Sequence, residues 1–220
     1  MSSRAPVRAV LFDLDGTFAD TAPDMRHALN RVLAQRNLPA LPLEAVRPYV
    51  SNGARGMVKA GFNLLPEDEG YAPLRDAFLH EYERALCVES RWFDGMRELV
   101  STLEQRDISW GIVTNKATRY THPLLQALDV TPRAACIVCG DTCARAKPHP
   151  DSLLHASQLI GIEPVHCLYI GDDLRDIQAA NAAGMRGVVA LYGYLGVDPQ
   201  PRTWPATAFV DSPTQIVTLL

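Results

Sequence analysis

The stretch VRAVLFDLDGT, residues 7–17, decides the fold of this chain. It opens with the apolar run Val7–Phe12 and continues directly into Asp13, Asp15 and Gly16. A short, continuous apolar run that ends in polar residues and glycine is typical of a buried strand in a parallel sheet. Because ligands bind beyond the carboxyl ends of the strands in such sheets, the two aspartates are candidates for a functional site.

Further apolar runs follow, each bounded by polar residues or glycine. They are Trp110–Val113, Cys136–Val138, Cys167–Ile170, Gly187–Leu191 and Ala208–Val210. Helical periodicity lies between the later runs, where Asp94 is a candidate N-cap for one helix and Pro150 suits the first turn of another. This alternation predicts an α/β fold, a Rossmann-like parallel sheet with helices on both faces.

The region from about residue 20 to residue 87 shows helix signals but no convincing strand. Pro23 suits a helix start, and further helices are expected over roughly Glu44–Gly61 and Tyr71–Cys87. We therefore expect an all-helical cap domain inserted after the first strand of an α/β core domain. The expected bounds are residues 1–18 and 89–220 for the core and residues 19–88 for the cap.

Composition and charge argue against several classes of protein. The chain has 220 residues, 47% of them hydrophobic, and a net charge of −4 from 21 basic and 25 acidic residues. No basic run suggests nucleic acid as a partner, and no stretch approaches the ~18 apolar residues of a membrane span. The N-terminal apolar run is too short for a signal peptide and ends in Asp13. We expect a cytoplasmic protein, monomeric or homodimeric, whose partner is a small molecule.

The five cysteines form an odd set in a chain without a signal, so free thiols are expected. The spacing of Cys136, Cys139 and Cys143 hints at a metal cluster. No second cysteine pair completes a zinc site, however, and Cys136 and Cys139 lie in a segment that predicts a buried strand. Packing is therefore the favoured interpretation, and any further role of these thiols stays open.

Polar residues follow the other predicted strands at the points where they end. They are Thr114-Asn115, Lys147-Pro148 in a loop, and Asp172, Asp173 and Asp176. Clustered carboxylates repel one another and need a cation at neutral pH, and oxygen ligands suit Mg²⁺. Lys147 and the metal could neutralise a phosphate to which Thr114 or Asn115 donates hydrogen bonds. An aspartate can also attack phosphorus, giving an aspartyl-phosphate that water later hydrolyses.

Taken together, these segments resemble the motifs of the haloacid dehalogenase-like phosphatase superfamily. The matching motifs are Asp13-x-Asp15-Gly16-Thr17, Thr114-Asn115, Lys147-Pro148 and Gly171-Asp172-x3-Asp176, in family-like order and spacing. The resemblance spans essentially the whole chain. The helical insertion after Thr17 is similar to the cap of the phosphoglycolate phosphatase branch. The resemblance implies a phosphoric monoester hydrolase with Mg²⁺ as its cofactor.

The resemblance also implies roles for the acidic residues. Asp13 would be the nucleophile and a metal ligand. Asp15 would be the general acid and base and would bind the metal through its backbone carbonyl. Asp172 would complete the metal shell, with Asp173 and Asp176 in support.

The remaining motif residues would handle the substrate. Thr114 and Asn115 would hold the phosphate, and Lys147 would steady both the nucleophile and the phosphate. Four segments resemble bacterial phosphatases of cell-wall recycling, namely residues 20–24, 51–58, 110–116 and 192–194. They favour N-acetylmuramic acid 6-phosphate, a small carboxylated phosphate, with 2-phosphoglycolate as the alternative. Arg55, between two glycines, is a candidate partner for the substrate carboxylate.

Other functions that use similar residues fit the sequence less well. A receiver-type signalling module accepts phosphate on an aspartate but lacks the second aspartate of Asp13-x-Asp15 and a helical insertion. A haloacid dehalogenase would keep the nucleophile and dispense with Asp15 and metal. A phosphomutase uses the same acid/base aspartate and stays an alternative, although Asp-Gly-Thr with this cap resembles the hydrolases better.

Overall fold

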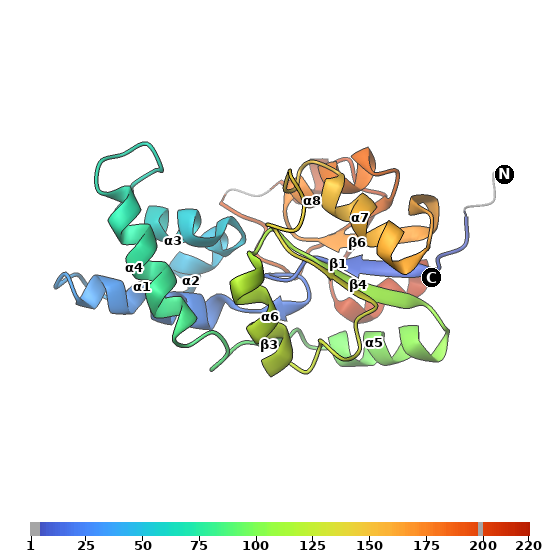
Figure 1. Ribbon diagram of the computed structural model, residues 1–220, viewed down its shortest axis with the longest axis horizontal. Coiled ribbons are helices and arrows are strands. Elements are labelled where there is room, and N and C mark those ends of the chain that lie inside the picture. Colours follow the sequence, from blue (N-terminus) through green and yellow to red (C-terminus); the bar gives the residue numbers. More distant parts are fainter. Residues whose placement is uncertain (1–4, 198–199) are drawn as a thin grey trace.

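The computed structural model describes residues 5–197 and 200–220. Residues 1–4, at the start of the expected core segment 1–18, and residues 198–199 lie outside the described residues. The described chain forms a sheet flanked by helices, with a group of further helices beyond one end of the strands (Figure 1).

Six parallel strands form the main sheet, in the order β5-β4-β1-β6-β7-β8. They are β1 (Ala9–Phe12), β4 (Ser109–Val113), β5 (Cys136–Val138), β6 (Cys167–Gly171), β7 (Arg186–Ala190) and β8 (Ala208–Val210). The parallel sheet predicted from the apolar runs is confirmed, with strand ends displaced by a few residues. Strand β1 lies between β4 and β6, so that Phe12 pairs with Ile112 on one side and Ile170 on the other.

Helices cover both faces of this sheet because alternate residues of each strand point to opposite faces. Val10 and Phe12 join one apolar cluster, and Ala9 and Leu11 join another. The first face is covered by α5 (Met96–Gln105), α6 (Thr118–Ala127) and the 3₁₀ helix η4 (Pro213–Leu219). The second is covered by α7 (Asp151–Ile160) and α8 (Leu174–Ala182).

The helical insertion is built around a second apolar cluster, to which Tyr120 and Tyr194 contribute from outside it. Its elements are α1 (Ala22–Ala34), α2 (Leu43–Val46), the 3₁₀ helix η1 (Arg47–Asn52), α3 (Gly53–Phe62) and α4 (Tyr71–Glu83). The single helix expected over roughly Glu44–Gly61 is thus divided into three pieces. Pro48 has no backbone N–H to donate, and Gly53 takes a positive φ of 56° where η1 ends. The resulting turn faces the ends of the sheet strands.

The two linkers between insertion and sheet pair with each other. β2 (Ala19–Asp20) runs antiparallel to β3 (Arg91–Trp92), an interaction that two-residue strands do not reveal in a sequence. Beside them the ring of Phe93 packs against that of Tyr192, with 5.2 Å between the two ring centroids. The N-cap predicted at Asp94 is wrong, because Gly95, with φ of 83°, directly precedes α5. Short 3₁₀ helices also occur at η2 (Pro164–His166) and η3 (Pro201–Thr203).

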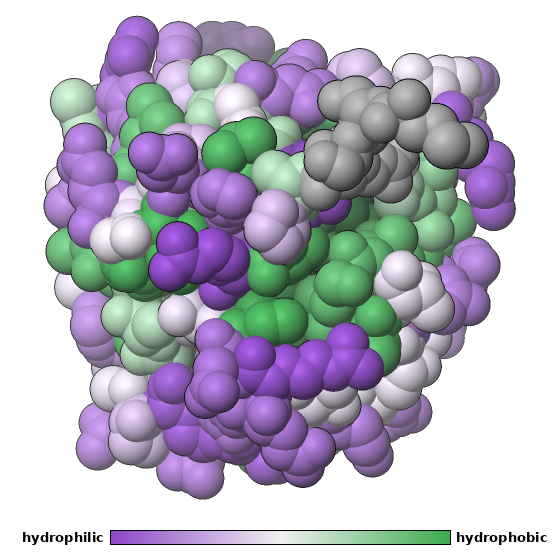
Figure 2. Space-filling model, turned by 90° about the vertical axis from the view of Figure 1, so that its right-hand side faces the viewer, coloured by the Kyte–Doolittle hydropathy of each residue, from purple (hydrophilic) through white to green (hydrophobic). Residues whose placement is uncertain are grey.

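The end of the molecule opposite the insertion shows apolar side chains gathered among polar ones (Figure 2). Partly buried side chains such as Val7, Ile108 and Leu220 pack against the core cluster. None of the helices in residues 5–197 and 200–220 combines the length and apolar character that a membrane crossing requires. The five cysteines are free thiols, and burial raises the pKa of Cys136 to about 12.

Candidate active site

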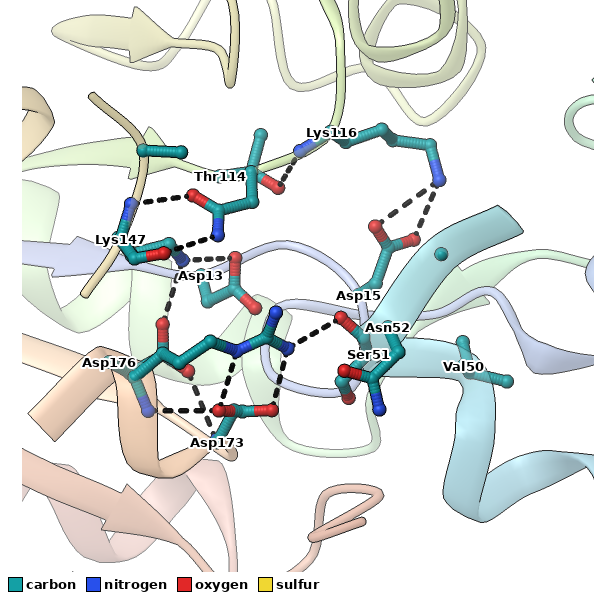
Figure 3. Close-up of a pocket in the computed structure, with 14 residues that line it drawn as sticks. Asp13, Asp15, Val50, Ser51, Asn52, Thr114, Lys116, Lys147, Asp173 and Asp176 are labelled. Atoms are coloured by element: carbon teal, nitrogen blue, oxygen red, sulfur yellow. Dashed lines mark hydrogen bonds and ion pairs between the residues drawn. The ribbon is translucent and has the colours of Figure 1, made fainter. Parts of the chain in front are cut away.

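The carboxyl ends of β1, β4 and β6 meet the helical insertion at a pocket of about 300 Å³ (Figure 3). The sheet side of the pocket is lined by Asp13, Asp15, Thr114, Asn115, Lys116, Ala146, Lys147, Asp173, Arg175 and Asp176. The insertion contributes the turn from Val50 to Gly53. Residues from four separate sequence motifs therefore converge on one cavity, as expected for a crevice beyond the strand ends.

Lys147 is the buried centre of a hydrogen-bond network in this pocket. Its Nζ donates to Oδ1 of Asp13 at 2.8 Å and to Oδ1 of Asp176 at 2.7 Å. The same ammonium donates to the Tyr169 hydroxyl at 2.7 Å and to the Val113 carbonyl at 3.2 Å. Burial alone would lower the pKa of Lys147, but the two carboxylates outweigh it and raise that pKa. The side chain is therefore a fixed positive charge beside Asp13.

Two buried carboxylates contact this ammonium, and a third, that of Asp172, lies close to them. Asp13, Asp172 and Asp176 each offer an oxygen within 4.8 Å of the others. Burial, followed by the charges of Asp13 and Asp176, raises the pKa of Asp172 well above its ordinary value. Burial also raises the pKa of Asp176 to about 6, although Lys147 opposes it. One ammonium does not balance three carboxylates, so the donor set fits a hard divalent cation.

Asp172 is held in place from both sides of the site. The Thr17 hydroxyl donates to its Oδ1 at 2.9 Å, and the backbone N–H of Tyr194 donates to its Oδ2 at the same distance. From the insertion, the Ser51 hydroxyl donates to Oδ2 at 3.1 Å. Gly16 permits this close packing, because a Cβ on its backbone would lie 2.3 Å from Oδ2 of Asp172.

Asp15 points away from this cluster toward Lys116 (Figure 3). Lys116 Nζ lies 3.0 and 3.2 Å from the two carboxylate oxygens, and the Thr21 hydroxyl donates to one of them at 2.6 Å. The Lys116 ammonium also lies 4.7 Å from the ring centroid of Tyr82 in α4. Burial would lower the pKa of Lys116, but Asp15 and Tyr82 outweigh it and raise that pKa. This ion pair joins two residues that follow sheet strands, and Tyr82 of the insertion packs against it.

The two residues after β4 differ in what their side chains contact. Thr114 is buried at the pocket wall, and its hydroxyl accepts the backbone N–H of Lys116 at 3.1 Å. The Asn115 amide donates to the Lys147 carbonyl and accepts the Lys147 backbone N–H, each at 3.0 Å. Asn115 therefore orients the loop that carries Lys147. Phosphate contacts by Thr114 and Asn115 stay predictions.

Asp173 and Asp176 begin α8 as a capping box, in which each side chain accepts a backbone N–H near the helix start. Arg175 pairs with both oxygens of Asp173 and donates to the Ser51 carbonyl at 2.9 Å. This guanidinium bridges the sheet and the insertion. Asp176 was expected only to support the metal site, and the structure places it within the carboxylate cluster itself.

Arg55 lies on α3, where its side chain is exposed, and it is not among the residues that line the pocket. The cationic residues that sequence reasoning missed are Lys116 and Arg175, which do line it. The sequence position of each of these two residues is a signal that could have identified it. Lys116 directly follows Thr114-Asn115 at a strand end, and Arg175 lies inside the run from Asp172 to Asp176.

This arrangement combines the parts that acyl-phosphate chemistry needs. Asp13 is a carboxylate that lines the pocket beside a fixed ammonium, and the carboxylate cluster can hold a cation there. Asp15, two residues later, supplies a second carboxylate that can carry a proton.

The comparisons with known proteins agree with this geometry. A family model described as haloacid dehalogenase-like hydrolase matches residues 10–190. The N-acetylmuramic acid 6-phosphate phosphatase of Pseudomonas putida is 40% identical over 210 residues, which are 96% of this chain and 94% of the relative. The phosphoglycolate phosphatase of Xanthomonas campestris pv. campestris is 44% identical over 209 residues, 95% of this chain and 94% of the relative.

A solved structure supports the fold independently. The crystal structure of a predicted phosphoglycolate phosphatase from Haemophilus somnus 129pt superposes with a TM-score of 0.84 at 25% identity, covering 97% of each chain. The family model spans β1 to β7 and therefore includes every strand end that forms the pocket. This chain belongs to the haloacid dehalogenase-like hydrolase family.

Proposed function

We propose that this protein is a Mg²⁺-dependent phosphomonoester hydrolase that acts through an aspartyl-phosphate on Asp13. One observation carries the proposal: the Asp13 carboxylate borders the pocket, 2.8 Å from the Lys147 ammonium and within the carboxylate cluster. A carboxylate in that setting lines a space that can take a phosphate ester, with three cationic side chains among the residues around it.

The proposed reaction has two steps. In the first, an Asp13 oxygen attacks phosphorus, the ester P–O bond breaks, and Asp15 gives its proton to the departing alkoxide oxygen. In the second, Asp15 takes a proton from water, whose oxygen attacks phosphorus and breaks the bond to Asp13. Inorganic phosphate leaves, and both carboxyl groups return to their starting states. Lys147 holds Asp13 in position, and Thr114 is the proposed donor to the phosphate.

Asp13, Asp172 and the backbone carbonyl of Asp15 are the proposed ligands of Mg²⁺, and the position of Asp176 makes it a further candidate. When bound, the ion supplies positive charge that neutralises the phosphate. Its requirement follows from the excess of buried carboxylates over ammonium groups in the cluster.

The proposed substrate is a small carboxylated phosphate, with N-acetylmuramic acid 6-phosphate first and 2-phosphoglycolate as the alternative. Relatives at 40% and 44% identity carry these two names, so overall similarity does not separate them. A cavity of about 300 Å³ is at the lower end of the range for drug-sized ligands, which favours the sugar phosphate over the much smaller glycolate ester. The proposal keeps the cytoplasmic location expected from the sequence.

Phosphate release from a panel of esters tests this proposal. The panel contains both carboxylated phosphates, a generic aryl phosphate and a sugar bisphosphate, each with Mg²⁺ and with EDTA. We expect release from at least one carboxylated ester with Mg²⁺ and none with EDTA. Hydrolysis that survives thorough chelation, or transfer of the phosphate to another hydroxyl without release, would favour the metal-free dehalogenase or the phosphomutase instead. Arg55 stays a predicted contact of the substrate carboxylate.

A further inference from the structure

Three cationic side chains line the pocket, and they differ in how fully their charges are matched. Lys147 contacts Asp13 and Asp176 together. Arg175 forms a two-pronged pair with Asp173, an arrangement that satisfies the carboxylate and the guanidinium at once. Lys116 pairs with Asp15 alone among the described acidic residues. Lys116 and Arg175 thus each depend on one carboxylate, and the partner of Lys116 is Asp15, the residue to which the proposed reaction assigns proton transfer.

The surroundings of Lys116 make that counter-charge important. Its side chain is only 9% exposed, and its ammonium lies over the ring of Tyr82, which itself belongs to the buried cluster of the insertion. An aromatic face attracts a cation but does not carry a full negative charge. A buried ammonium that loses its carboxylate is strongly disfavoured. Lys116 therefore requires an anion whenever the insertion is closed over the pocket.

The proposed reaction removes the Asp15 carboxylate from Lys116. To act as general acid, Asp15 must take up a proton from solvent and reach the oxygen of the leaving group next to Asp13, yet in this structure its carboxylate is held by Lys116 and by the Thr21 hydroxyl. Turning Asp15 toward the phosphate leaves Lys116 without its partner. A second anionic group on the substrate, at the far side of the pocket from the phosphate, would supply the missing charge.

We propose that Lys116 selects carboxylated substrates, because the substrate carboxylate replaces Asp15 as its partner and so frees Asp15 for proton transfer. The inference rests on the proposed function and adds to it a specificity-determining residue and a reason for the carboxylate. A substrate with phosphate alone leaves Asp15 paired with Lys116 and reacts more slowly. The recognised group is a carboxylate separated from the phosphate by the body of the substrate.

Matched substrate pairs test the proposal. One pair is N-acetylmuramic acid 6-phosphate and N-acetylglucosamine 6-phosphate, and the other is 2-phosphoglycolate and 2-hydroxyethyl phosphate. The measured quantity is the ratio of kcat/KM for the carboxylated member to kcat/KM for the neutral member. Lys116→Met keeps an unbranched side chain beside Tyr82 without the charge, and we expect it to lower the ratio by roughly 30- to 1,000-fold in the preferred pair. Lys116→Arg should keep most of the ratio.

Arg55→Ala is the comparison variant, and unfolding midpoints establish that each variant folds. If Lys116→Met lowers kcat/KM equally for both members of each pair, Lys116 is a positioning residue for Asp15 and the proposal is overturned. A fall in the ratio with Arg55→Ala but not with Lys116→Met would also overturn it, in favour of Arg55. Wild-type ratios near one in both pairs would overturn it without any variant. Failure of the wild type to release phosphate from any ester would instead refute the proposed function.

Discussion

Ser90 donates both its backbone N–H and its hydroxyl to Oδ2 of Asp24, over 2.8 and 2.6 Å. The backbone N–H groups of Val88 and Glu89 also donate to this carboxylate, at distances between 3.0 and 3.1 Å. Asp24 is in the first turn of α1, where the helix begins, and Ser90 precedes β3, where the chain returns to the sheet. One buried carboxylate therefore ties together the two crossings between the insertion and the sheet.

Replacing the Asp24 carboxylate should loosen the connection between the insertion and the sheet. We expect Asp24→Ala to lower the free energy of unfolding by about 2 kcal/mol, because hydrogen bonds to a charged acceptor are lost and the helix start loses a favourable negative charge. Chemical denaturation measures the change. Asp76→Ala is the control, because its carboxylate is 64% exposed and pairs with the neighbouring Arg75. Equal and small effects of both substitutions would mean that Asp24 does not anchor the linkers.

Asp13→Asn should abolish turnover without unfolding the protein. The amide cannot form an acyl-phosphate, whereas its oxygen can still accept the hydrogen bond from Lys147 at the position of Oδ1. The loss of one negative charge also relieves repulsion in the carboxylate cluster. Phosphate release and an unfolding curve are measured side by side, with the exposed Asp211→Asn as the control. Wild-type turnover in Asp13→Asn would remove the nucleophile assignment.

The stabilisation by Mg²⁺ should increase with pH. The pKa of Asp176 is raised to about 6, above its ordinary value of about 4. Without a cation, its contribution to stability is therefore present below about pH 4 and lost as the pH rises through about 6. A cation needs the deprotonated carboxylates, so the gain in Tm on adding Mg²⁺ should be larger near pH 7.5 than near pH 5.

The same titration of Asp176→Asn provides the control for that prediction. Removing this carboxyl group should make the gain in Tm depend less steeply on pH. A gain that is independent of pH in the wild-type protein, or an identical dependence in Asp176→Asn, would show that this carboxyl group does not respond to the ion.

Gly16→Ala should displace Asp172. Gly16 has φ of 91°, and an added Cβ would lie 2.3 Å from Oδ2 of Asp172. We expect kcat/KM to fall by about 100-fold or more, because small displacements of reacting groups are costly, and the gain in Tm with Mg²⁺ to shrink. Gly161→Ala is the matched control, since Gly161 also has a positive φ but no atom within 4 Å of the added Cβ. It should cost only about 1 kcal/mol of stability through backbone strain. Similar kinetics for the two variants would contradict the crowding argument.

Much of the fold could be predicted because its signals are local. The apolar run before Asp13 is a strand, and the polar residues that follow such runs lie at the carboxyl ends of the strands, as expected for a parallel sheet. The prediction from local patterns failed at two helix boundaries. Helical periodicity did not reveal the break at Pro48 and Gly53, and the acidic side chain of Asp94 suggested a cap that Gly95 makes unnecessary.

By itself the sequence determined the order of the motifs, the parallel sheet and the presence of a helical insertion, because hydrophobic periodicity and turn residues act over a few positions. Only the tertiary structure decided which side chains complete the pocket. Lys116 meets Asp15 from 101 positions away, and Ser51 meets Asp172 from 121 positions away. The first contact depends on the pairing of β1 with β4 and the second on how the insertion lies over the strand ends, and no local pattern encodes either. The buried charge of Lys116 acquires its partner only there, whereas Arg55, which the sequence favoured, stays on the exposed surface of α3.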